Sequence, residues 1–194
     1  LNLLLQDSVQ VAANIQESPQ EISTDSQTSP SKVIADDFQD GLDAFNKKDF
    51  KTAYQLFFEL AEQGDAEAQS NLGMMYGKGR GVPQDDPKTV KWWKLAAEQG
   101  DGKAQTNLGW MYEKGRGALQ DNQKAIKWYQ LAAKQGRAKA QYNLGMMYAN
   151  GQGVSQNYKE AIRWWKLSAE QGFVLGQYNL GVKYDLGDGV PQDY

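Results

Sequence analysis

Glycine-rich segments are the residues of this chain that most resemble a chemical site. Residues 77–81 read GKGRG, which has the glycines and cations of a phosphate-binding loop, and residues 115–117 and 151–153 repeat the glycine spacing. A phosphate-binding loop follows a strand and opens directly into a helix. These segments each follow a helical pattern instead and recur at a fixed interval, so we interpret them as tight turns between helices.

Few other residues offer catalytic or metal chemistry. The chain has no histidine and no cysteine, which removes the usual general base and the usual nitrogen and thiolate ligands. Residues 185–189 read DLGDG but lack the oxygen-ligand spacing of a calcium loop, and Asp85 or Asp86 precedes a helical pattern where it can act as a cap. We therefore predict no catalytic residues, no metal site and no cofactor.

Aromatic pairs at residues 92–93, 128–129 and 164–165 could form a stacking platform for sugars or bases. Their spacing instead places them on the apolar stripe of a helix, together with Thr89, Leu95, Ala96 and Ala97 in the first copy. We expect these aromatic residues to form core. Lysines between them, such as Lys91 and Lys94, are then expected on a solvated face.

Charge is distributed unevenly along the chain. The chain has 24 acidic and 21 basic residues. Residues 1–40 contain seven of the acidic residues and one of the basic residues, so residues 41–194 contain 17 acidic and 20 basic residues. A net charge of +3 over that body lacks the clustered basic stripe of a nucleic-acid-binding protein, so we expect no nucleic-acid partner. No stretch reaches the roughly 20 apolar residues that a membrane-spanning helix needs.

The elements that must position these residues come from a 36-residue repeat. Full copies cover residues 66–101, 102–137 and 138–173; a partial leading unit covers 37–65 and a truncated unit covers 174–194. Fixed-period self-similarity is typical of solenoids. In the first copy Ala68, Leu72, Met75 and Tyr76 form one helical stripe, glycines then break it, and a second helix ends at Gly100. Each unit is therefore expected to be two antiparallel helices.

The repeat resembles the Sel-one-like repeat family, a relative of the tetratricopeptide repeats. The shared pattern is A-x-A-Q-x-N-L-G-x-M-Y-x-x-G-x-G-V-x-Q-D-x-x-K-A-x-x-W-x-x-L-A-A-E-Q-G, and it recurs in register over roughly residues 37–194. The resemblance implies an all-α, right-handed α-α superhelix whose members act as adaptors for macromolecular complexes. It also implies that the second helices form the convex side.

The segment before the repeats has a different composition. Residues 13–36 are rich in Ser, Gln, Thr, Asp and Glu, so we expect a disordered tail. Residues 1–12 contain an apolar cluster, and residues 11–13 read VAA, which resembles a signal-peptide cleavage site; a short amphipathic helix is the alternative. A signal-derived segment over residues 1–36 would make the protein periplasmic or secreted, with a cytoplasmic location as the alternative.

Repeat positions whose residue differs between copies are the candidates for partner binding, because the positions that build the fold must keep the same residue in every copy. If the first helices line the concave face, their varying positions form an apolar and aromatic strip edged by lysines, and aromatic residues and Met are favoured interface anchors. The recurring amides at Gln69 and Asn71 could bind a peptide backbone or could join neighbouring units. The predicted partner-binding residues are Asn71, Met74, Lys103, Asn107, Trp110, Lys139, Tyr142, Asn143, Met146 and Tyr178.

Three functions follow from these observations. The first is a non-enzymatic scaffold that binds a peptide or helix of a partner protein in its concave groove. The second is a cell-envelope module that binds glycan or peptidoglycan, in line with the possible export signal. The third is a β-lactamase-like hydrolase, by analogy with cysteine-rich relatives; those relatives carry a disulfide in each repeat, which this chain lacks.

Overall fold

The computed structural model describes residues 30–186, and within that range the chain is helical without strands. The helices are α1 (Pro30–Asn46), α2 (Phe50–Glu62), α3 (Ala66–Lys78), α4 (Asp86–Glu98), α5 (Gly102–Lys114), α6 (Asn122–Lys134), α7 (Ala138–Asn150), α8 (Tyr158–Glu170) and α9 (Val174–Leu186). The expected all-α solenoid is confirmed. Helix α1 begins at Pro30, earlier than residue 37, where we expected the tail to end. The apolar cluster at 1–12, the tail up to residue 29 and the end of the last unit at 187–194 lie outside the described residues.

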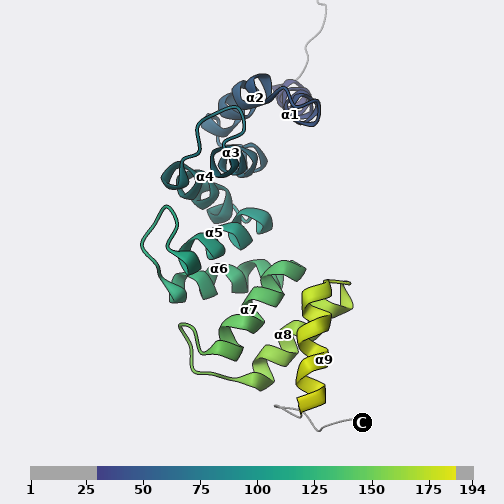
Figure 1. Ribbon diagram of the computed structural model, residues 1–194. Helices are drawn as coiled ribbons and strands as arrows, with labels where there is room; N and C mark the ends of the chain where they lie inside the picture. The colour runs from purple at the N-terminus through teal and green to yellow at the C-terminus, as the bar shows by residue number, and fades with distance from the viewer. Residues whose placement is uncertain (1–29, 187–194) are drawn as a thin grey trace, which may run out of the picture.

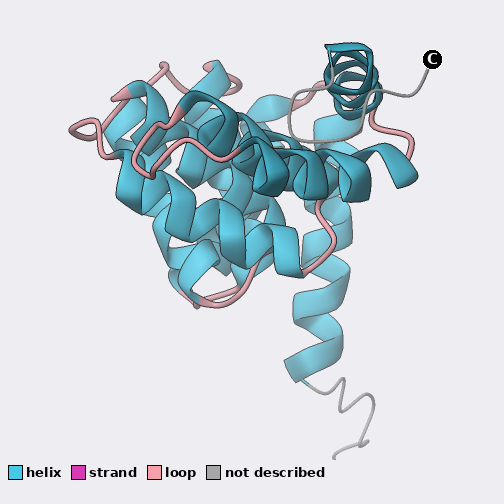
Figure 2. Cartoon of the chain, turned by 90° about the horizontal axis from the view of Figure 1, so that it is seen from below, coloured by secondary structure: helices cyan, strands magenta, loops and turns pink. Residues whose placement is uncertain are grey.

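The helices stack in chain order. Every helix pair with substantial contact is consecutive, from α1 with α2 to α8 with α9. Figure 1 shows the stack as an arc, and Figure 2 shows it from below as paired helices joined by loops. None of the described helices is both long enough and apolar enough to cross a membrane.

Repeated polar caps and glycines set the ends of the helices. Asp65 and Asp101 accept hydrogen bonds from the backbone N–H groups of the third residues of α3 and α5, at 2.7 Å and 2.5 Å. Asp85, Asp121 and Asn157 do the same for α4, α6 and α8. Helices α3, α5 and α7 end at glycines with φ of 62°, 64° and 66°, a left-handed conformation that favours glycine.

Glycine and aromatic residues interlock inside each unit. A Cβ atom added to Gly73 would lie 2.5 Å from the Trp93 ring, and one added to Gly145 would lie 2.5 Å from the Trp165 ring. Trp93 and Trp165 are buried, and Tyr129 occupies the same place against Gly109. The expected aromatic core is therefore present in all three full units.

Two details of the expected core were wrong. Trp128 and Trp164 are only partly buried and pack against the core, although Trp92 of the same identical column is buried; the neighbouring column, which contains Tyr129, is buried in all three full copies. The recurring leucines Leu95 and Leu131 are more than a third exposed. Identity between copies thus does not rank residues by burial.

The recurring glutamines join neighbouring units. Within one unit, Gln99 Nε2 donates to Gln69 Oε1 at 2.9 Å, and Gln135 Nε2 donates to Gln105 Oε1 at the same distance; Gln99 Nε2 also donates to the carbonyl oxygen of Gly64 in the preceding unit, at 3.0 Å. Gln69 Nε2 in turn donates to the carbonyl oxygen of Ala61 in the preceding unit, at 3.1 Å. The side-chain amides of these glutamines therefore hold the fold together. Of the two roles that the sequence left open for Gln69, peptide binding and joining units, the structure shows the second.

The glycine-rich segments are inter-helix turns, as interpreted from the sequence. The last glycine of each turn, which is Gly81, Gly117 or Gly153, has a positive φ and packs against the preceding unit. A Cβ atom at Gly117 would collide with the backbone carbonyl of Asp86, and one at Gly153 would lie 2.8 Å from Asn122 Cβ. Only glycine allows this close approach, so the turns set the spacing of the solenoid.

Candidate partner-binding groove

A row of pockets follows the first helices along the solenoid, one pocket at each junction between units. The pocket between α3 and α5 has a volume of about 360 Å³, the one between α5 and α7 about 290 Å³, and the one between α7 and α9 about 220 Å³. Neighbouring pockets share walls: Trp110 lines the first and second, and Met146 lines the second and third. We call this row the groove.

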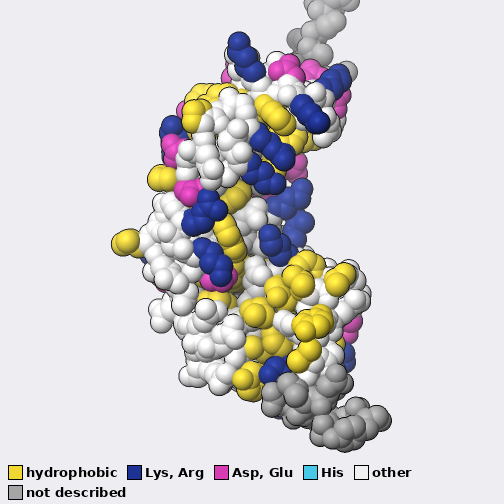
Figure 3. All heavy atoms as spheres, viewed as in Figure 1, with side chains coloured by type: hydrophobic (Ala, Val, Ile, Leu, Met, Phe, Trp, Pro, Cys, Tyr) yellow, Lys and Arg dark blue, Asp and Glu magenta, His cyan; other side chains and the backbone are white. Residues whose placement is uncertain are grey.

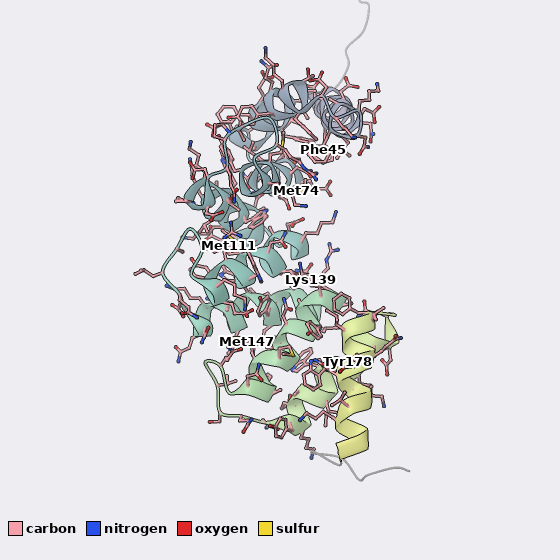
Figure 4. All side chains as sticks on the ribbon, in the orientation of Figure 1. Phe45, Met74, Met111, Lys139, Met147 and Tyr178 are labelled. Atoms are coloured by element: carbon pink, nitrogen blue, oxygen red, sulfur yellow. The ribbon has the colours of Figure 1, made fainter. Side chains whose placement is uncertain are left out.

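One repeat position contributes a methionine or a tryptophan to the walls of these pockets. The residues at this position are Met74, Trp110 and Met146. In Figure 4, Met74 and Lys139 lie nearer the open side of the arc than Met111 and Met147 do. Met111 and Met147 belong to an identical column and are buried in the core. Helical spacing therefore sends one methionine column to the groove and the other to the core.

Trp110 is held in place by a charged pair from two other elements. The guanidinium of Arg116 lies 5.3 Å from the centre of the Trp110 ring. Arg116 Nη2 donates to Asp86 Oδ1 at 2.8 Å, and Arg116 Nε donates to Asp86 Oδ2 at 3.0 Å. A two-pronged contact of this kind fixes a guanidinium in one plane. The indole therefore presents a pre-positioned apolar surface to the pockets on both sides.

The predicted asparagines differ in what they bind. Asn71 Nδ2 donates to the carbonyl oxygen of Glu67 within its own helix, at 3.0 Å. Asn107 lies in the wall of the first pocket, and Asn143 lies in the wall of the second with its Nδ2 atom buried and without a hydrogen-bond partner. The two central asparagines, unlike the glutamines, therefore belong to pocket walls, although the Nδ2 atom of Asn143 is itself buried.

The middle full unit, residues 102–137, has a buried polar pair, Tyr129 and Glu113, where the other full units have a tryptophan with a glycine or an alanine. Tyr129 replaces the tryptophan of the other copies, and its hydroxyl donates to Glu113 Oε2 at 2.8 Å. Burial, followed by the charge of Glu113, raises the pKa of Tyr129, so the phenol stays a donor. The Glu113 side chain is only 14% exposed and also pairs with Lys114. The pocket between α5 and α7 thus offers a fixed carboxylate beside the Asn143 amide.

Lysines and an arginine edge the groove near the start of α5 and α7. Lys103, Arg137 and Lys139 line a neighbouring pocket of about 340 Å³. Lys139 and Asn107 belong both to this pocket and to the one between α3 and α5. Figure 3 shows Lys and Arg side chains gathered in the hollow of the arc. Arg137 was missed by the sequence reasoning, although it departs from the Asp65 and Asp101 column, as Phe173 also does.

The two predicted tyrosines have different surroundings. Tyr142 lines the pocket between α5 and α7 and packs against Phe173, with ring centres 5.4 Å apart. Tyr178 on α9 is 68% exposed and lines none of these pockets. Nine of the ten predicted residues therefore line the groove or the pockets beside it, and Tyr178 lies apart from them.

The described part of the chain contains no group of three or more His, Cys, Asp or Glu side chains that could hold a metal ion. The groove instead combines apolar walls, amides and a cationic edge. Such a surface can bind an extended chain by filling pockets with side chains and by hydrogen bonding to its backbone.

The chain was compared with family models, curated proteins and solved structures. The model of the Sel1 repeat matches residues 38–65, 66–101, 102–136, 138–173 and 174–194. Among curated proteins, none matches the chain. The crystal structure of a Sel1 repeat protein from Oxalobacter formigenes is 37% identical with a TM-score of 0.75, and the match covers 80% of this chain and 64% of that one.

A second similar structure is c5321, a protective antigen present in uropathogenic Escherichia coli strains that displays an SLR fold. It is also 37% identical, with a TM-score of 0.81, and the match covers 84% of this chain and 36% of that one. The present chain therefore spans less than two thirds of the length of both proteins.

Proposed function

The chain belongs to the Sel1 repeat family, and from that premise we propose that it binds an extended segment of a partner protein in the groove along α3, α5 and α7. Proteins of this family generally act as scaffolds for protein–protein interaction, and the fold is typically non-catalytic. The proposal adds a binding surface and a mode of binding to that general role.

The observation that carries the proposal is the sharing of walls between successive pockets. Because Trp110 and Met146 each belong to two pockets, side chains of one continuous ligand can occupy neighbouring pockets without a gap. A ligand that spans several pockets gains affinity from each of them, whereas a small molecule could fill only one. The geometry thus favours a chain-like ligand.

Polar groups at the groove suit a peptide backbone. Asn107 and Asn143 line successive pockets at the same position of their repeats. Side-chain amides donate and accept, so each can pair with the N–H and C=O groups of an extended peptide.

A peptide display selection followed by variant binding tests this function. Peptides selected on the wild-type protein should bind the variant Trp110→Ala/Tyr142→Ala about 100-fold more weakly or worse, because aromatic anchors dominate interface energies. Leu119→Ala is the matched control, since Leu119 is 91% exposed and lies outside the pockets. Circular dichroism should show the helicity of all variants unchanged.

Two outcomes would contradict the proposal. The first is selected peptides that bind the double variant with the Kd of the wild type. The second is a soluble peptidoglycan fragment that binds when no peptide does and that depends on Trp110, which would favour the carbohydrate-binding alternative.

A further inference from the structure

We propose that Lys103, Arg137 and Lys139 form a subsite for a carboxylate of an acidic partner segment. The inference rests on the proposed peptide-binding groove and names the chemistry of its ligand. We call these three residues the basic ridge. They come from the starts of α5 and α7, and all three line one pocket of about 340 Å³ with Thr106 and Asn107.

Two acidic residues lie near the basic ridge, since Lys103 and Arg137 also line a second pocket with Glu67 and Asp101. None of its three members forms an ion pair within residues 30–186, whereas Arg116 pairs with Asp86. The acid beside it, Asp101, already accepts hydrogen bonds from Ser70 Oγ at 3.1 Å and from the N–H of Ala104. Three cations lining one pocket without a paired carboxylate create a positive potential that an anionic ligand would complement.

Arg137 occupies the position at which two other units have Asp65 and Asp101 and a third has Phe173. Asp65 and Asp101 cap α3 and α5 through their side chains, while Arg137 makes no side-chain cap to α7. Loss of such a cap lowers helix stability. The exchange of a capping acid for a cation therefore works against folding at this position, which points to a role in binding.

A second departure from the repeat accommodates Arg137. The first residue of α3 and of α7 is alanine, but that of α5 is Gly102. A Cβ atom at Gly102 would lie 2.8 Å from Arg137 Nε and 3.2 Å from Arg137 Cγ. The arginine stem thus lies across the first turn of α5, which directs the guanidinium to the pocket that Lys103 and Lys139 also line.

These features select a carboxylate beside an apolar side chain. A guanidinium presents N–H donors in a planar fork that matches the two oxygens of a carboxylate. Asn107 and Lys139 also line the pocket between α3 and α5, which contains Met74 and Trp110. The expected ligand therefore has an Asp or Glu side chain next to a large apolar residue that enters the neighbouring pocket.

Fluorescence anisotropy with designed peptides tests the subsite. The probes are labelled peptides in which two acidic residues adjoin one aromatic residue, and sister peptides in which Gln or Asn replaces the acids. The wild-type protein should bind the sister peptides about tenfold more weakly or worse, because charge-assisted hydrogen bonds are lost. Amidation of the C-terminus should leave affinity unchanged, because an Asp or Glu side chain supplies the carboxylate; a loss of affinity on amidation would contradict this assignment.

Arg137→Asp separates binding from folding. The variant restores the capping residue of the other units, so its Tm should equal or exceed that of the wild type, while affinity for the acidic peptides falls at least tenfold. Lys103→Gln/Lys139→Gln should show the same loss. The matched control, Lys127→Gln/Lys134→Gln, removes two exposed lysines from α6 and should keep affinity within about twofold, because it alters net charge away from the ridge.

The subsite is overturned if Arg137→Asp binds the acidic peptides as the wild type does. It is also overturned if the control variant loses as much affinity, if an oligonucleotide binds the ridge as tightly as the peptides, or if none of the acidic peptides binds. Loss of binding in Trp110→Ala/Tyr142→Ala with full binding in Arg137→Asp would reject the subsite and leave the groove standing.

Discussion

The column Trp93, Tyr129 and Trp165 and the column Met74, Trp110 and Met146 recur at the same period but have opposite surroundings. The first packs each aromatic ring against a glycine of its own unit and is buried. The second lies at the junctions between units, in the walls of successive pockets. Both contain tryptophan, so residue type alone does not separate the residues that build the solenoid from those that face a ligand.

The partner atoms make the difference. Trp93 Nε1 donates to the carbonyl oxygen of Ser70 at 3.0 Å, and Trp165 Nε1 donates to that of Tyr142 at 3.2 Å, so both indoles are satisfied inside one unit. Trp110 is instead held from outside its helix by Arg116. A ring that completes its own unit is part of the fold, whereas a ring positioned at a junction remains available.

Truncation of one ring from each column should give the largest difference. Trp165→Ala should reduce the free energy of unfolding by about 3–5 kcal/mol, because it removes a buried ring and leaves a cavity. Trp110→Ala should cost only about 1–2 kcal/mol, since the ring is partly solvated and packs only at the edge of two core clusters besides contacting Arg116. Urea denaturation followed by circular dichroism measures both, and equal losses would erase the distinction between the columns.

The glycine column offers a test in which the sign changes. Gly145→Ala should destabilise by about 1–3 kcal/mol, since the new Cβ atom meets the Trp165 ring at 2.5 Å. Gly181→Ala should stabilise by about 0.5–1 kcal/mol, because nothing lies within 4 Å and alanine favours a helix. Thermal melts of the two variants compare them directly. A destabilised Gly181→Ala would mean that α9 has a tightly packed neighbour at this position.

Acid titration should give the smallest effect and concerns the caps that fix the second helices. Hydrogen bonds from the N–H of Lys88 and of Lys124 lower the pKa of Asp85 and Asp121 below 3.8. A lowered folded-state pKa contributes stability above the unfolded pKa of about 3.9, and that contribution is lost as pH falls through the folded value. The Tm should therefore decrease below about pH 4 through these two groups.

Asp85→Asn/Asp121→Asn is the matched control, because Asn157 already caps α8 in the third unit by accepting from the N–H of Glu160. The variant should keep its helices and show a weaker decrease of Tm below pH 4. Groove variants such as Trp110→Ala should keep the full decrease. An unchanged acid dependence in the Asn variant would show that other carboxylates dominate.

The fold could be predicted from the sequence because the same pattern of apolar residues, glycines and helix caps recurs in every full copy of the repeat. The helix pairs, the glycine turns and the aromatic core are set by interactions within one unit, and one copy contains all of those residues. The roles of Leu95 and of Trp128 were misjudged because exposure depends on how far a helix is rotated against its neighbours. Periodicity gives the face of a helix only to within a fraction of a turn.

The groove was accessible only in part. Columns that vary between copies indicated Met74, Trp110 and Met146, which the structure brings into shared pocket walls. The sequence could not distinguish Gln69, which bonds between units, from Asn143, which faces a pocket, because both recur in every copy. Arg137 was overlooked because its placement depends on Gly102, which lies 35 residues earlier at the other end of the same unit.

The location of the pockets at junctions ties ligand binding to the curvature of the whole array. Each helix contacts substantially only its neighbours in the chain, so the solenoid bends by small changes of angle between units. Every such change widens or narrows a pocket, because Trp110 and Met146 belong to walls on two sides. A segment that fills several pockets therefore fixes these angles together. Curvature and ligand affinity then depend on the same equilibrium between solenoid conformations. An array whose curvature already fits the ligand binds that ligand more tightly.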